Sequence, residues 1–117
     1  MPFRIFRNDI TKVRADAIVN TANPKPVIGR GTDSAIYAAA GEEKLLAERR
    51  KIGSIAPGQS AETPAFDLPA KYILHTVSPS WIDGQHKEEA LLRKAYDAAL
   101  TLAERLGCRS VAFPLMA

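Results

Sequence analysis

Residues 17–40 read AIVNTANPKPVIGRGTDSAIYAAA and predict a strand, a long loop and a helix in that order. The apolar run 17–19 ends at the polar Asn20, as expected of a short buried strand. Two prolines and two glycines between Asn20 and Asp33 exclude regular structure over most of that segment. The Ala-rich run from Asp33 favours a helix, which Gly41 ends. A loop of this length is uncommon in a compact domain unless it has a function.

The rest of the chain alternates between strand and helix patterns. The segment 71–77 is β-branched and aromatic, as expected of a strand, and the apolar positions of 86–106 advance by three or four, as expected of an amphipathic helix. An α/β fold is therefore predicted, with helices on the faces of a sheet. The last strand follows a crossover helix, so we expect it in the interior of a parallel or mixed sheet. The further expected elements are strands at 3–7, 59–64 and 109–113 and a helix at 42–52.

The composition indicates one folded domain over residues 1–117. The hydrophobic fraction of 46% is enough for a core, and the single Cys108 excludes an internal disulfide. With only two histidines besides, we expect no metal site and no cofactor. Neither a signal-peptide pattern nor a membrane-spanning run is present, so the prediction is a cytoplasmic protein that does not enter a membrane. The net charge of +3 is dispersed, which makes nucleic-acid binding an unfavoured alternative.

The loop and the helix start after it form a candidate anion site. A strand, a glycine-containing loop and a helix N-terminus in succession bring backbone N–H groups and the helix dipole to one place. Here Gly29, Gly31 and the amides up to Asp33 are the candidates. Ser34 replaces the third glycine of the dinucleotide fingerprint, and no P-loop lysine is present. The alternative is that these glycines only turn the chain and cap the helix.

Two asparagines lie where the strand passes into the loop. Asn20 and Asn23 are three residues apart, and an amide can both donate to and accept from ribose hydroxyls without carrying charge. The alternative is that they staple the loop through local hydrogen bonds. Both interpretations stay open at the level of sequence.

Several motifs resemble the macro domain family in order and spacing, from about Arg4 to the last residue. The segments that carry the resemblance are NDITK at 8–12, DAIVNTAN at 16–23, GTD at 31–33, DLPAKYILHTVSP at 67–79 and SVAFP at 110–114. The resemblance implies a three-layer sandwich, with a central mixed and largely parallel sheet flanked by helices. It also implies binding of ADP-ribose or of ADP-ribosylated proteins.

The resemblance further implies roles for individual residues. Asp9 would accept from the adenine amine and the Ile10 amide would meet a ring nitrogen, while Asn23 would contact the distal ribose. The backbone of Gly29, Arg30, Gly31, Thr32 and Asp33 would cradle the diphosphate. Ile28 and Asn20 are further candidate ligand-binding residues. In hydrolytic members the residues matching Asn23 and Asp33 help to position the scissile bond and a water molecule, which makes these two the candidate catalytic residues. The alternative for Asp9 is a carboxylate that only caps a turn.

The chain also departs from the family pattern. Ile28 and Arg30 stand where many members have glycine, Tyr37 stands where hydrolytic members often have histidine, and Ser78 replaces a usual glycine. Binding is therefore the leading hypothesis, and hydrolysis of ADP-ribosyl groups or of O-acetyl-ADP-ribose is the alternative. An RNA-binding or protein-interaction module on the same fold is the second alternative. His75, on an apolar strand, is interpreted as a core histidine.

The C-terminal end gives a separate expectation. In the family a second glycine-rich loop follows the strand that matches 110–113, whereas this sequence ends at Ala117 before such a loop. We therefore expect a domain that lacks its C-terminal elements, either as a fragment or with cover from another chain. An uncovered last strand would favour self-association.

Overall fold

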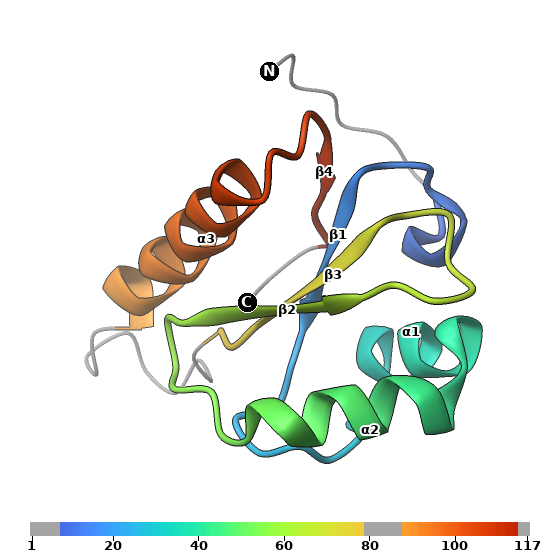
Figure 1. Cartoon of the computed structure of the whole chain (residues 1–117). Coiled ribbons are helices and arrows are strands. Elements are labelled where there is room, and N and C mark those ends of the chain that lie inside the picture. Colours follow the sequence, from blue (N-terminus) through green and yellow to red (C-terminus); the bar gives the residue numbers. More distant parts are fainter. Residues whose placement is uncertain (1–7, 79–87, 115–117) are drawn as a thin grey trace.

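The computed structural model describes residues 8–78 and 88–114, which form a mixed four-stranded sheet between helices (Figure 1). The predicted α/β fold is confirmed, and most predicted elements agree within two residues. The strand expected at 3–7 lies outside the described residues. In chain order the elements are η1 (Ile10–Lys12, one 3-10 turn), β1 (Ala17–Thr21), α1 (Thr32–Ala40), α2 (Glu42–Ile52), β2 (Ser60–Pro64), β3 (Tyr72–Thr76), α3 (Glu88–Arg105) and β4 (Val111–Ala112).

The strands lie in the order β2-β3-β1-β4. β1 runs parallel to β3 and to β4, and β2 runs antiparallel to β3. Within the described residues β4 is an outer strand that pairs with β1 alone, so the expectation of an interior strand is wrong for this part of the chain. Its two residues are only half-buried, unlike the first four residues of β1, which are buried.

Two apolar layers fill the space between the sheet and the helices. α3 covers one face, where its Ala95 and Ala99 pack with Val19 and Leu74. α1 and α2 cover the other face, as Figure 1 shows, and Ile36 of α1 packs there with residues of β1 and β3. Because side chains alternate along a strand, each central strand contributes to both layers. None of the described helices combines the length and apolar character needed to cross a membrane.

The parallel register brings polar residues together at one end of the sheet. Asn20 pairs with His75, and Thr21 pairs with Thr76. Ile18 and Ile73, two positions earlier on each strand, belong to the layer under α1, so Asn20 and His75 face the same side. A polar pair thus lies beneath α1, where the loop leaves β1.

Candidate functional site

The loop between β1 and α1 covers residues 22–31 and lies at the carboxyl ends of β1 and β3. It is anchored near its start, where the Ala22 amide donates to Thr76 O at 3.0 Å and the Ile55 amide donates to Pro24 O at 2.7 Å. Its middle reaches outward, and the Val27 side chain is 56% exposed. The predicted loop is therefore present, and it has the position in an α/β sheet where ligands commonly bind.

A buried carboxylate determines how the loop ends. Asp33, in the first turn of α1, is 4% exposed. Its Oδ1 accepts from Asn20 Nδ2 and its Oδ2 accepts from the Gly29 amide, both at 2.6 Å. Hydrogen bonds to an ionised group are shorter and stronger than neutral ones, especially away from water. One side chain therefore joins the end of β1, the end of the loop and the start of α1.

Glycine is favoured at two positions of the loop for different reasons. A Cβ on Gly29 would lie 2.9 Å from Asn23 Nδ2 and 3.2 Å from Asp33 Oδ2, so the ends of these two side chains would have to shift to admit it. Gly31 has φ 68° and ψ −127°, a conformation that is strained for any residue with a side chain. It serves as the N-cap of α1 without a side-chain cap. Among the described residues, the first-turn amides of α1 thus have neither an intrahelical acceptor nor a side-chain one.

A chain of hydrogen bonds continues from Asn20 across the sheet. Asn20 Nδ2 lies 3.3 Å from His75 Nδ1, and His75 Nε2 lies 3.0 Å from Thr63 Oγ1. Because Thr63 Oγ1 donates to Pro64 O, we assign the His75 proton to Nε2, which leaves Nδ1 to accept from Asn20. Burial first, and the charge of Arg49 second, lower the pKa of His75 to about 3. His75 is therefore a neutral core residue with both ring nitrogens satisfied, as the sequence indicated.

Asn20 lies behind the site. It is fully buried, and its two amide protons are used by Asp33 and His75. In this structure Asn20 therefore holds Asp33, and its expected contact with a ligand stays a prediction. Its Oδ1 is buried and has no hydrogen-bond partner among the described residues. Such an unpaired acceptor is costly, and a hydroxyl donor could satisfy it.

Asn23 is half-buried and faces the inside of the loop. Its Nδ2 donates to Val27 O at 3.2 Å, which is the loop-stapling contact that the sequence left open. The same amide lies beside Gly29, as the close approach above shows. Asn23, Gly29 and Asp33 are therefore brought together, whereas Arg30 and Gly31 beside them are exposed.

Asp9 and Ile10 lie apart from these residues, on η1 beside α1. Asp9 Oδ1 accepts from the amide and the hydroxyl of Thr11, at 3.0 and 2.7 Å, so the carboxylate caps η1. These bonds lower the pKa of Asp9, the hydroxyl bond most. Within the described residues Asp9 has no hydrogen bond to the loop. Ile10 and Ile28 nevertheless pack against the same apolar layer under α1.

Arg49 supports the loop from α2, a role that the sequence did not indicate. The residue is 1% exposed, and its guanidinium donates to the carbonyls of Asn23, at 3.1 Å, and Pro24, at 3.2 Å, and to Gly53 O. Its spacing of four from the buried Leu45 is the signal that could have placed it on the inner face of the helix.

Tyr37 packs beside His75. It is 2% exposed, and its ring centroid lies 6.4 Å from that of His75. Burial, with the nearby negative charge of Asp33, raises the pKa of its hydroxyl to about 12. A neutral phenol therefore stands beside His75.

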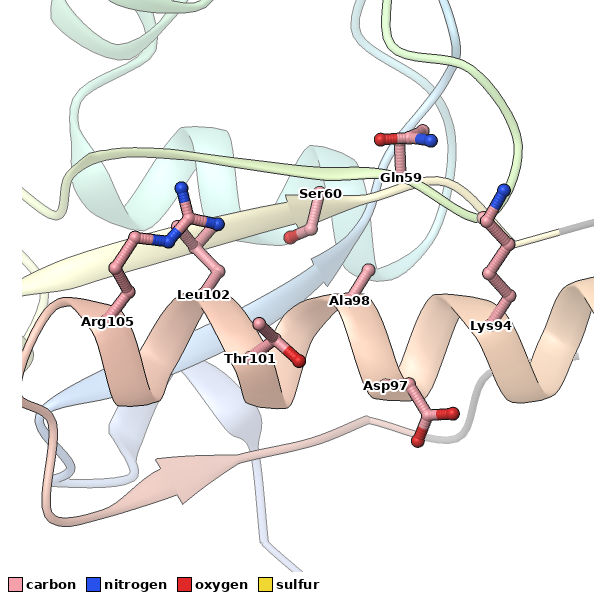
Figure 2. A pocket seen from close by; sticks show the side chains of 9 residues that line it. Gln59, Ser60, Lys94, Asp97, Ala98, Thr101, Leu102 and Arg105 are labelled. Carbon is pink, nitrogen blue, oxygen red and sulfur yellow. The ribbon is translucent and has the colours of Figure 1, made fainter.

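A groove of about 270 Å³ lies elsewhere, between α3 and the start of β2 (Figure 2). Lys94, Thr101 and Arg105 line it from α3, and Ser60 lines it from β2. It contains none of the predicted ligand-binding residues. The described residues also contain no group of three or more histidine, cysteine or acidic side chains that could hold a metal ion.

Comparison with known proteins gives consistent matches. A family model described as Macro domain matches residues 19–117. The chain is 47% identical over 111 residues to a macro domain-containing protein of Lactiplantibacillus plantarum, and 47% identical over 113 residues to an O-acetyl-ADP-ribose deacetylase of Citrobacter rodentium. These matches cover 95% and 94% of this chain. The chain spans 64% of the length of each relative.

Solved structures also resemble the chain. A macrodomain of Oceanobacillus iheyensis with ADP matches with a TM-score of 0.87 at 35% identity, over 93% of this chain and 60% of that one. A Trypanosoma brucei macrodomain in complex with ADP-ribose matches with a TM-score of 0.82 at 37% identity, over 92% of this chain and 44% of that one.

Acid is expected to destabilise the chain through His75. Its pKa is lowered from the ordinary 6.5 to about 3, so between these values the unfolded chain binds more protons than the folded one. Stability is therefore complete above about pH 7 and falls as the pH falls, by about 2 kcal/mol between pH 7 and pH 5. Urea unfolding at several pH values measures this loss. His75→Gln should remove most of the dependence, and a folded variant with unchanged dependence would contradict the assignment.

Proposed function

We propose that this chain, which belongs to the macro domain family, binds ADP-ribose or an ADP-ribosylated ligand at the β1–α1 loop. The observation that carries the proposal is the loop itself. Two glycines in constrained positions, a buried carboxylate that fixes the loop and an uncapped helix N-terminus together form an anion-binding arrangement. The likeness to a macrodomain in complex with ADP-ribose supports the choice of ligand.

The hydrogen bonds already made in the structure indicate which amides would meet the diphosphate. The Gly29 N–H donates to Asp33, so it serves the loop and not the ligand. The amides that follow, from Arg30 through Gly31 to Thr32 and Asp33, are the proposed cradle, with Ile28 and Gly29 shaping it. Because Arg30 and Gly31 are exposed, an anion can approach them without rearrangement of the core.

The remaining roles follow the family resemblance. Asn23 is proposed to contact the distal ribose, exchanging its bond to Val27 O for one to a ribose hydroxyl. Asp9 and the Ile10 amide are proposed to recognise adenine. The two Asp9 bonds to Thr11 both use Oδ1, so its exposed Oδ2 can accept from the adenine amine. Both contacts would complement a ligand that extends along α1.

Hydrolysis of an ADP-ribosyl bond or of O-acetyl-ADP-ribose is the second candidate, because relatives are named O-acetyl-ADP-ribose deacetylase. Asn23 and Asp33 would be its catalytic residues. Asp33 already accepts a hydrogen bond at each oxygen, and His75 is buried and neutral, so neither is a free general base in this state. Catalysis would therefore depend on positioning a water molecule, and binding is the function that the geometry supports better.

The location of the protein and its partners are also proposed. A cytoplasmic location and an ADP-ribosylated protein as partner suit the family and the absence of a membrane-crossing helix among the described residues. Self-association through the C-terminal strand is proposed because β4 pairs on one side only within the described residues. RNA binding is the less favoured alternative.

A calorimetric titration with ADP-ribose tests the proposal, with AMP and NAD as comparators. We expect saturable one-to-one binding of ADP-ribose that is tighter than that of AMP, because AMP lacks the second phosphate and the distal ribose that the loop is proposed to bind. Backbone chemical-shift changes should centre on residues 28–33. Absence of binding, or shift changes confined to another face of the molecule, would overturn the proposal.

Asp9→Ala should weaken ADP-ribose and AMP by a similar factor of roughly ten, since both ligands contain adenine and lose the same hydrogen bond. Asp97→Ala is the matched control, because it removes an exposed carboxylate from the distant α3. Calorimetry on the three folded proteins makes the comparison. If Asp9→Ala binds ADP-ribose as the unmodified chain does, Asp9 only caps η1.

A further inference from the structure

We infer that Arg49 is a positioning residue, which holds the first half of the β1–α1 loop, and Asn23 in particular, in the shape that binds ligand. The inference rests on the proposed function and deepens it, because Arg49 has no place among the groups expected to touch ADP-ribose. Three observations support the inference: the Arg49 side chain is buried, its hydrogen-bond partners are backbone carbonyls, and no carboxylate in the described part of the chain pairs with it.

Arg49 is a buried cation without a matching anion. Its side chain is 1% exposed, and in the described part of the chain no carboxylate oxygen lies within 4.0 Å of its guanidinium. Burial lowers its pKa, which reflects the cost of removing the charge from water. A well-packed apolar side chain often stabilises such a position at least as well as a buried charge does. Core packing alone therefore does not explain an arginine here.

The partners of Arg49 explain it better. All three are backbone carbonyls, two in the loop at Asn23 and Pro24 and one at Gly53, directly after α2. The planar guanidinium presents several donors in a fixed fork, so one side chain can bind carbonyls from two segments. Arg49 thereby ties the start of the loop to the end of α2.

Arg49 and Asp33 hold opposite ends of one loop by complementary chemistry. Asp33 accepts an N–H from Gly29 near the loop's end, and Arg49 donates to C=O groups near its start. Between these two points the side chain of Asn23 lies against Gly29, so close that its end would have to shift to admit a Cβ there. A shift of the Asn23 backbone would move its amide out of this arrangement and away from a bound ribose. Small displacements of positioning groups can be costly in affinity and rate.

The test compares Arg49→Met and Arg49→Lys with Arg50→Met, which removes the same charge from the exposed neighbouring position. Calorimetry measures ADP-ribose binding, and an NMR titration measures adenosine, which lacks the diphosphate and the distal ribose that the loop is proposed to bind. We expect Arg49→Met to bind ADP-ribose at least about tenfold more weakly and adenosine within twofold of the unmodified chain. Arg49→Lys should recover part of the loss, and Arg50→Met should show none.

A purely structural role predicts a different pattern, in which both ligands weaken together or neither weakens. Either pattern in folded proteins would overturn the inference. If Arg49→Met does not fold, Arg49→Lys carries the comparison. In the unmodified chain, the side-chain NMR signals of Arg49 should also shift when ADP-ribose is added, while those of Arg50 stay in place. Unshifted Arg49 signals at saturation would count against the inference.

Failure of the proposed function can be distinguished from failure of the inference about Arg49. If the unmodified chain binds no ADP-ribose, the proposal of binding fails. The role of Arg49 in holding the loop is then tested by NMR of the chain without ligand. The Asn23 side-chain amide and the Gly29 backbone amide should shift in Arg49→Met and not in Arg50→Met. Unchanged signals at both positions would show that Arg49 does not hold the loop.

Discussion

The two hydrogen bonds of the buried Asp33 carboxylate are the constraint on which the site depends. One oxygen accepts from Asn20 at the end of β1 and the other accepts from the Gly29 amide at the end of the loop. Because the carboxylate belongs to the first turn of α1, the strand, the loop and the helix are fixed relative to one another. The loop amides beyond Gly29 are then presented outward. Groups that are fixed before a ligand arrives lower the entropic cost of binding it.

The sheet makes this constraint possible. Parallel pairing places Asn20 opposite His75, and Thr63 on the antiparallel β2 completes a row of polar groups under α1 and α2. In a low-dielectric interior such a row is favourable only if its members satisfy one another. A neutral His75 meets this requirement, since it accepts from Asn20 and donates to Thr63. The same burial that keeps His75 neutral also excludes it as a catalytic base.

The elements could be predicted from the sequence because their signals are local. The Ala-rich run from Asp33 and the apolar spacing of 86–106 predicted helices, and Gly41 and the two loop prolines marked where regular structure ends. The roles of Asn20 and Arg49 could not be predicted, because they depend on which faces meet in the folded chain. Asn20 was expected at a ligand and is fully buried, and Arg49, for which the sequence indicated no role, is 1% exposed. Asp33 was expected at the helix start. Its hydrogen bond to the Gly29 amide could not be predicted, because no sequence pattern reveals that contact.

The most direct test of this account is amide hydrogen exchange at Gly29 in the ligand-free chain, compared with Asp33→Asn. The account predicts slow exchange in the unmodified chain, because the Gly29 amide donates to a buried carboxylate. In Asp33→Asn the exchange at Gly29 should accelerate strongly while the amides of β1 stay protected, since the sheet itself remains intact. Fast exchange at Gly29 in the unmodified chain, or equal protection in a folded Asp33→Asn, would contradict the claim that this carboxylate organises the loop.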